Sequence, residues 1–203
     1  MLYLLTGDVQ IGKTRWLEEL VGALRMRGVT PYGVLAPGVW VESTSERANA
    51  QGLEKLGIDN VLLPSGTRLR FATRTDIAKS TGAYQEKSQA GQEGLGWHIS
   101  DSALAEVNAY LKTIPELSAA VSEPGVLIID ELGRLELLRN QGLTEAMALL
   151  TQGPLPHLQD AILIVRDVLS NIAEERYADI WGGCERIAPS PEAFTMLVER
   201  LCS

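Results

Sequence analysis

The sequence has 203 residues, of which 45% are hydrophobic and 22% are charged, a balance typical of globular proteins and not of wholesale disorder. Lys and Arg total 18 and Asp and Glu total 26, so the formal net charge is −8. Because proteins that bind nucleic acid need a basic face, this acidic balance argues against a nucleic-acid partner.

No apolar run in the sequence approaches the ~20 residues that a membrane-spanning helix needs, so we expect no membrane association. The first residues, Met1 to Leu5, form a short apolar run without a basic leader or a small-residue cleavage site. Cys184 and Cys202 cannot make a four-ligand thiolate site and are typical of reduced thiols. We therefore expect a cytoplasmic protein, and a monomer, since nothing in the sequence demands a larger assembly.

The N-terminal part of the chain alternates strand and helix. Residues 2–5 are apolar and are followed by Thr6-Gly7, which predicts a short buried strand. Residues 14–27 repeat apolar side chains on one helical face, and Gly28 suits the position after the helix end. Residues 32–35 predict a second short strand.

Residues 36–96 are the least regular part of the sequence and are rich in Gly and Pro. Within them, residues 61–63 and 68–72 flank Pro64-Ser65-Gly66-Thr67 and predict a β-hairpin. Residues 83–96 are polar and contain several glycines, which predicts a mobile loop. We expect this segment to form an irregular insert in the domain.

Strands and helices alternate again in the second half. The predicted strands are short runs, at residues 97–99, 126–129, 161–165 and 186–188. The predicted helices each have one apolar face, at residues 104–111, 143–150 and 191–201. Pro115 restarts or kinks the first of these helices, and Ser190-Pro191 begins the last. The alternation predicts a single three-layer α/β domain over residues 1–203, with a mostly parallel central sheet.

The strongest motif is Gly7-Asp8-Val9-Gln10-Ile11-Gly12-Lys13-Thr14, which matches G-x-x-x-x-G-K-[ST] between a predicted strand and helix. Its glycines let backbone N–H groups point inward at phosphate oxygens, and the helix N-terminus adds partial positive charge. The alternative is a plain glycine turn with a surface lysine. We predict that the nucleotide is bound by Gly7, Asp8, Val9, Gln10, Ile11, Gly12, Lys13, Thr14 and Arg15.

A second motif is the apolar run Val126 to Ile129, which ends in Asp130-Glu131. In a phosphate-loop protein, an Asp at the end of such a strand helps to hold Mg²⁺ together with the loop hydroxyl, here that of Thr14. A Glu directly after it can act as general base on the attacking water. The alternative for Glu131 is a solvated loop acid. For this chemistry we expect the two strands that carry the motifs to be neighbours in the sheet.

The segment Asp130-Glu131-Leu132-Gly133-Arg134-Leu135-Glu136-Leu137 resembles the Asp-Glu-Ile-Gly-x-Met-Glu signature of a family of small P-loop nucleoside triphosphatases, the thermophile-type and cancer-related NTPases. Gly33 to Pro37, Gly66 to Phe71 and Gly96 to Ile99 resemble further segments of that family in the same order, so the similarity covers most of residues 1–170. The chain departs from the family pattern at Gln10, Arg15, Arg134 and Leu135.

This resemblance implies slow, Mg²⁺-dependent hydrolysis of ATP, GTP and other nucleoside triphosphates. It also implies a sheet of the additional-strand type, with the Asp130 strand beside the phosphate-loop strand. In this scheme Lys13 holds the β- and γ-phosphates, and Glu131 activates water. The metal is held by Thr14 directly and by Asp130 through water.

Arg166 follows the predicted strand at residues 161–165, whose carboxyl end borders the γ-phosphate region in such a sheet. Two roles fit it equally: contact with the γ-phosphate in the transition state, or an ion pair with Asp167 or another nearby acid. We count it with Lys13 and Glu131 as a predicted catalytic residue. Arg134 is a further candidate from the signature loop.

Three functions remain open from the sequence. The first is Mg²⁺-dependent hydrolysis of ATP or GTP. The second is a nucleotide or small-molecule kinase whose acceptor lies under residues 36–96, where Arg68, Arg70 and Arg74 supply positive charge. The third is a nucleotide-dependent switch that binds a protein partner, which the sequence does not identify. The absence of an Asn-Lys-x-Asp motif leaves the preferred base open.

Overall fold

The computed structural model describes residues 1–8, 11–86 and 96–202. The strands are β1 Leu2–Leu5, β2 Thr30–Leu35, β3 Gly38–Glu42, β4 Leu53–Leu63, β5 Arg68–Arg74, β6 Trp97–Ile99, β7 Gly125–Leu132, β8 Leu158–Val165 and β9 Cys184–Ile187. The helices are α1 Lys13–Met26, α2 Thr75–Ser80, α4 Asp101–Leu111, α5 Ile114–Ala119, α6 Arg134–Arg139, α7 Thr144–Gln152, α8 Asp167–Tyr177 and α9 Pro191–Leu201. None of these helices has both the length and the apolar character needed to cross a bilayer.

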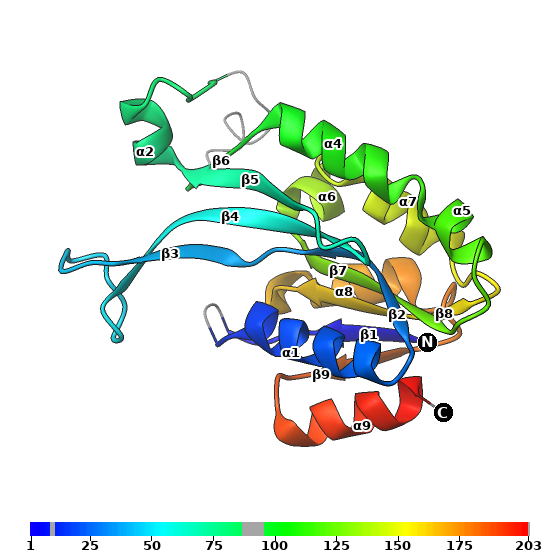
Figure 1. Cartoon of the computed structure of the whole chain (residues 1–203). Helices are drawn as coiled ribbons and strands as arrows, with labels where there is room; N and C mark the ends of the chain where they lie inside the picture. The colour runs from blue at the N-terminus through cyan, green and yellow to red at the C-terminus, as the bar shows by residue number, and fades with distance from the viewer. Residues whose placement is uncertain (9–10, 87–95, 203) are drawn as a thin grey trace.

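The strands of the described residues form one nine-stranded sheet in the order β6-β5-β4-β2-β7-β8-β1-β9, with β3 paired to β4 (Figure 1). The pairs from β2 to β9 are parallel. Strands β1, β7 and β8 are buried over most of their length because helices cover both faces. Helices α1 and α9 pack on one face, and α4, α5, α7 and α8 pack on the other (Figure 1). The predicted three-layer α/β fold with a parallel core is confirmed.

The expectation that the Asp130 strand lies beside the phosphate-loop strand is wrong. Strand β8 pairs with β1 on one side and with β7 on the other, so it separates the two. This is the additional strand that the resemblance implied. Adjacent strands lie about 4.8 Å apart, so β1 and β7 are about 10 Å apart, a gap that the loop and side chains at the strand ends bridge. Neighbouring strands are therefore not needed to bring the two motifs together.

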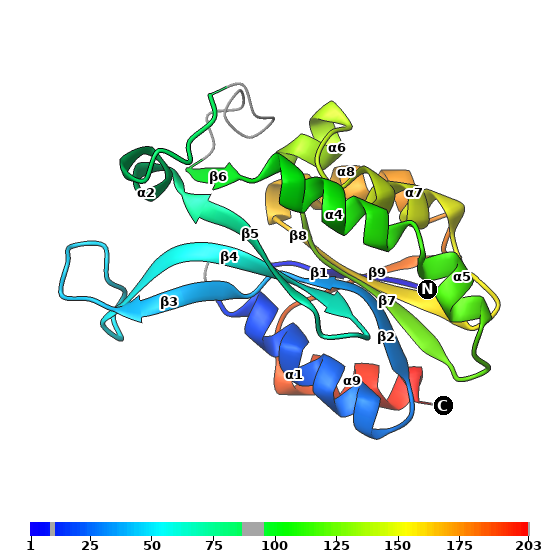
Figure 2. The same ribbon diagram turned by 45° about the horizontal axis from the view of Figure 1, so that its top comes forward.

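Where the structure describes it, at residues 36–86, the segment 36–96 continues the sheet and is not the irregular insert that we expected. The hairpin predicted around Pro64 is confirmed as the antiparallel pair β4–β5. Strand β3 and the first half of β4 were missed, because Gly and charged residues interrupt the apolar alternation there. Figure 2 shows β3 and β4 projecting together beyond the other strands. Of the predicted mobile loop, residues 87–95 lie outside the described residues.

Helices α6 and α8 were also missed by the sequence analysis, since each has only a narrow apolar face. In α8 the buried face consists of Leu169, Ser170, Ala173 and Tyr177. The predicted C-terminal helix is confirmed as α9. Its first turn is capped as the sequence indicates, because the Ser190 hydroxyl accepts the Ala193 N–H at 3.1 Å.

A polar cluster ties the loop after β3 to strands β4 and β5. The buried carboxylate of Glu54 accepts hydrogen bonds from the Ser43 hydroxyl at 2.7 Å and the Ser45 hydroxyl at 2.8 Å, and it pairs with Arg74. The Ser43 hydrogen bond, followed by those of Arg74 and Ser45, lowers the pKa of Glu54 to about 2. The ionised carboxylate therefore holds the projecting hairpin in shape.

We expect Glu54→Gln to lower the Tm near neutral pH by an amount that shrinks in acid. A lowered pKa means that the stabilisation is present above the ordinary pKa of 4.5 and is lost as the pH falls towards 2. Thermal unfolding of wild type and variant at a series of pH values measures the difference. Glu46→Gln is the control, because the side chain of Glu46 is exposed in the same loop. A Tm difference that stayed constant down to pH 2 would contradict the role of the carboxylate.

Candidate active site

The carboxyl ends of three parallel strands bring the two motifs and Arg166 to one edge of the sheet. Strand β1 ends at Leu5 and leads into the glycine-rich loop, and β8 ends at Val165, directly before Arg166. Strand β7 carries Asp130 and Glu131 close to its end. Because the strands are parallel and in register, these groups meet at one place.

The glycine-rich loop holds its lysine by its own backbone. The ammonium of Lys13 donates to the carbonyl of Gly7 at 2.6 Å and to that of Asp8 at 2.8 Å. Gly12, the N-cap of α1, has a φ of 93°, a conformation that favours glycine. The charge of Lys13 therefore lies over the start of the loop, where phosphate oxygens can replace the two carbonyls. Val9 and Gln10 of the predicted loop lie outside the described residues.

Asp130 joins three parts of the chain. Its Oδ1 accepts the hydroxyl of Thr14 at 3.2 Å, and its Oδ2 accepts the backbone N–H of Ala36 at 2.8 Å. The side chain is deeply buried, with 4% of the residue exposed, and this burial raises the pKa of Asp130 to about 7. A buried carboxylate without a compensating charge is a place where a bound cation stabilises the ionised form.

The donors at this position suit Mg²⁺. Mg²⁺ prefers oxygen ligands, keeps several of its waters and is usually bound by one or two protein groups together with substrate phosphates. The hydroxyl of Thr14 and the carboxylate of Asp130 are such oxygens, and their hydrogen bond places them at the start of α1, beside the loop. The donor set therefore fits the ion that the sequence analysis implied.

Glu131 has an unusual backbone that turns it away from the buried row of β7. Its φ is 76°, which a residue other than glycine adopts at a cost of about 1–3 kcal/mol. The register between β7 and β8 shifts between Ile129 and Leu132, and bulges of this kind re-aim side chains next to active sites. As a result the Glu131 side chain is 42% exposed, so that water reaches its carboxylate.

Arg166 forms an ion pair, the second of its two expected roles, and its partner is Glu131. The distance from Nε of Arg166 to Oε1 of Glu131 is 2.9 Å. Asp167, the partner considered from the sequence, instead accepts the N–H of Gly7 through its Oδ1 at 2.7 Å. Asp167 thus anchors the start of the loop, a role that the sequence analysis missed. Nothing in its spacing marks it, because the contact joins residues 160 positions apart.

Three other candidate residues have exposed side chains. Arg15 is on the exposed side of α1, with 86% of its side chain exposed, 3.7 Å from Glu19. Ile11 is exposed at the loop, and Arg134 is exposed at the start of α6. The structure therefore brings together Gly7, Lys13, Thr14, Asp130, Glu131 and Arg166.

Glu136, the last acid of the signature, has a structural role. Its carboxylate is buried and accepts the N–H of Gly133 at 2.9 Å through Oε2 and that of Leu143 at 3.1 Å through Oε1. It closes the first turn of α6 and holds the loop that leads to α7. Gly142 makes room for it, since a Cβ there would lie 2.0 Å from Oε1. Part of the signature thus supports the loop that follows the active-site strand.

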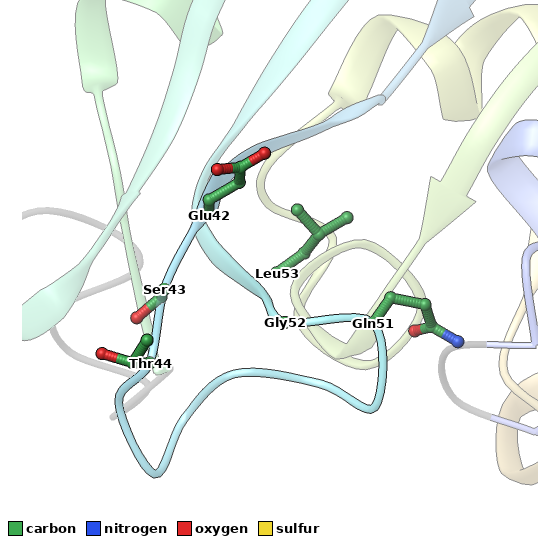
Figure 3. A pocket seen from close by; sticks show the side chains of 6 residues that line it. All are labelled: Glu42, Ser43, Thr44, Gln51, Gly52 and Leu53. Carbon is green, nitrogen blue, oxygen red and sulfur yellow. The ribbon is translucent and has the colours of Figure 1, made fainter.

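A hollow at the tip of the β3–β4 hairpin is a separate feature (Figure 3). The described residues that line it are Glu42, Ser43, Thr44, Gln51, Gly52 and Leu53. They come from the end of β3, the following loop and the start of β4. They include no predicted site residue, so the candidate active site remains at the strand ends.

Comparisons with known proteins show the family of this chain. A family model described as NTPase matches residues 2–159. The chain belongs to this NTPase family.

Among solved structures, that of THEP1 from the hyperthermophile Aquifex aeolicus is 17% identical with a TM-score of 0.58, covering 98% of this chain and 96% of that one. The solution structure of a human cancer-related nucleoside triphosphatase is 16% identical with a TM-score of 0.56, covering 98% and 93%. The search of curated proteins found no match. The resemblance inferred from the signature is confirmed, and the two structures show that the fold is shared.

We expect Glu136→Ala to lower the free energy of unfolding by about 2–4 kcal/mol, because it leaves the buried N–H groups of Gly133 and Leu143 without an acceptor. Urea unfolding measures the change. Glu175→Ala, at an exposed position of α8, is the control and should stay within about 0.5 kcal/mol of wild type. Equal stability of the two variants would contradict a structural role for Glu136.

Proposed function

We propose that this NTPase-family protein hydrolyses ATP or GTP to the diphosphate and inorganic phosphate, with Mg²⁺, as one domain over residues 1–203. The observation that carries the proposal is the hydrogen bond from Thr14 to Asp130, which joins two motifs 116 residues apart beside the ammonium of Lys13. A plain glycine turn with a surface lysine, the alternative for this motif, does not account for this hydrogen bond to a buried carboxylate.

The phosphates bind to the N-terminus of α1. The backbone N–H groups of the loop donate to phosphate oxygens, and Lys13 exchanges its two carbonyl partners for the β- and γ-phosphates. Thr14 would hold Mg²⁺ directly, and Asp130 would hold it through water. When bound, the ion neutralises charge on the β- and γ-phosphate oxygens.

Glu131 is the general base in this proposal. Its carboxylate accepts a proton from water as the water oxygen bonds to the γ-phosphorus. The bond from that phosphorus to the β–γ bridging oxygen breaks, and the nucleoside diphosphate leaves with the electron pair. Arg166 orients the Glu131 carboxylate through Nε, and the other guanidinium N–H groups remain for the γ-phosphate.

The kinase alternative depends on a free basic patch in the segment 36–96. Arg68 and Arg70 lie 3.3 Å and 2.7 Å from the carboxylate of Asp59. Arg74 pairs with Glu54 and Asp76. These acids already compensate the arginines, which lends no support to an acceptor site there, and water is the acceptor that we propose. We further propose that the protein acts in the cytoplasm as a monomer, with the nucleoside triphosphate as its partner.

We expect the wild-type protein to release phosphate from ATP or GTP only when Mg²⁺ is present. We expect this release to need no acceptor other than water. Lys13→Ala should lower turnover by at least about 100-fold and abolish nucleotide binding in calorimetry, because it removes the phosphate-binding charge. Phosphate release is measured with ATP, GTP, CTP and UTP. Lys112→Ala, exposed at the end of α4, is the control. Absence of nucleotide binding by wild-type protein would overturn the proposal.

We expect Glu131→Gln to bind nucleotide as wild type does and to lose about 10²–10⁴-fold in turnover, because the amide cannot accept the proton. Single-turnover hydrolysis and calorimetry separate the two effects. Arg166→Ala removes the ion-pair partner of Glu131. This variant tests the role of Arg166 in the same assays. Undiminished turnover in Glu131→Gln would exclude Glu131 as the base. Unchanged turnover and affinity in Arg166→Ala would exclude a catalytic role for Arg166.

A further inference from the structure

Lys55, on the projecting strand β4, is held between two indole rings. Its Nζ lies 5.3 Å from the centroid of the Trp97 ring and 5.9 Å from that of the Trp40 ring. Trp40 is the residue of β3 that pairs with Lys55, and Trp97 begins β6. Within residues 1–8, 11–86 and 96–202, Lys55 has no salt bridge. It is a half-buried ammonium with aromatic rings around it and no acid in contact.

One electrostatic and one geometric observation relate Lys55 to the acids of the candidate active site. Its burial lowers the pKa of Lys55, and the carboxylates of Glu131 and Asp130 oppose that change, so these two acids are the charges that act on it. The side chain passes over Gly38, because a Cβ on Gly38 would lie 2.8 Å from Cε of Lys55. Gly38 is two residues from Ala36, whose N–H holds Asp130.

The projection of β3 and β4 explains this placement. Both views show the two strands extending beyond the strand ends where the glycine-rich loop begins (Figures 1 and 2). Strand β2 ends at Leu35, at the same sheet edge as the active-site strands, and β3 begins at Gly38. Strands β3 and β4 thus place the stem of Lys55 at the end of the sheet that carries the candidate active site, outside the parallel core.

We propose that Lys55 binds the γ-phosphate of the bound nucleoside triphosphate. The inference rests on the proposed function and adds a phosphate-binding residue to it. If Glu131 directs water at the γ-phosphorus, that phosphate lies next to Glu131 and Asp130. These are the two acids that interact electrostatically with the ammonium of Lys55. A charge-assisted hydrogen bond to phosphate is stronger than the contact of an ammonium with an indole, so the exchange is favourable.

The surroundings of Lys55 suit this role. The two indoles hold the flexible stem in place, so less conformational entropy is lost when the phosphate binds. Gly38 leaves the room that the stem needs, since a Cβ there would also lie 2.5 Å from Nε1 of Trp40. A diphosphate ends at the β-phosphate, which Lys13 and the loop hold, and so it gains nothing from Lys55. Lys55 therefore distinguishes the triphosphate from the diphosphate.

The test compares the affinities of Lys55→Met for a non-hydrolysable triphosphate analogue and for the diphosphate of the same base, both with Mg²⁺. Met keeps the length of the stem and its contact with the rings but lacks the charge. We expect the Kd of the triphosphate analogue to rise about 10-fold or more and that of the diphosphate to stay within about 2-fold of wild type. Lys55→Arg keeps the charge and should recover most of the triphosphate affinity.

Two further variants sharpen the result. Lys79→Met is the matched control, because Lys79 also lies over an aromatic ring, 4.8 Å from the centroid of Tyr84, but on α2. It should change neither Kd. Gly38→Ala displaces the stem of Lys55 without removing its charge and should weaken the triphosphate selectively. Circular dichroism and Tm establish that each variant is folded.

The outcomes separate this inference from the proposed function. Selective loss of triphosphate affinity in Lys55→Met and Gly38→Ala supports the assignment. Unchanged affinity, or equal loss for both nucleotides, overturns it while wild-type hydrolysis leaves the proposed function intact. Failure of wild-type protein to bind either nucleotide overturns the proposed function and the assignment with it.

Discussion

The site depends on the hydrogen bonds that the buried carboxylate of Asp130 accepts. This carboxylate accepts the Thr14 hydroxyl from the first turn of α1 and the Ala36 N–H from the end of β2. One side chain on β7 thereby aligns the glycine-rich loop with the start of the segment 36–96. Burial disfavours the charged form of this carboxylate, so a cation bound beside it would stabilise the ionised form.

The protein is acidic overall, with a net charge of −8, and yet its proposed ligand is a polyanion. Attraction must therefore be concentrated locally, since net charge says little about a single site. Lys13 lies at one strand end and Arg166 at the next, where we propose that they supply it. In our proposals, Mg²⁺ between Thr14 and Asp130 and the ammonium of Lys55 complete the set.

Both the parallel core and the antiparallel half of the sheet shape the site. Strand β8 separates the two motif strands and places Arg166 beside Glu131. Strands β3 and β4 pass beyond the strand ends, and the cluster around Glu54 fastens their far end. Within the segment that looked least regular in the sequence, β3 and β4 thus form an arm that extends beyond the strand ends of the site.

The sequence by itself determined the local features. The strand before Gly7, the helix after Gly12, the apolar strand that carries Asp130 and the Ser190 cap each depend on residues close in the chain, and these predictions are confirmed. The family followed from the residues after Asp130. Tertiary structure alone decided the strand order, the Arg166–Glu131 pair, the anchoring of Gly7 by Asp167 and the place of Lys55. These contacts join residues far apart in the chain, and their partners are set by the register and twist of the sheet, which no local pattern of residues encodes.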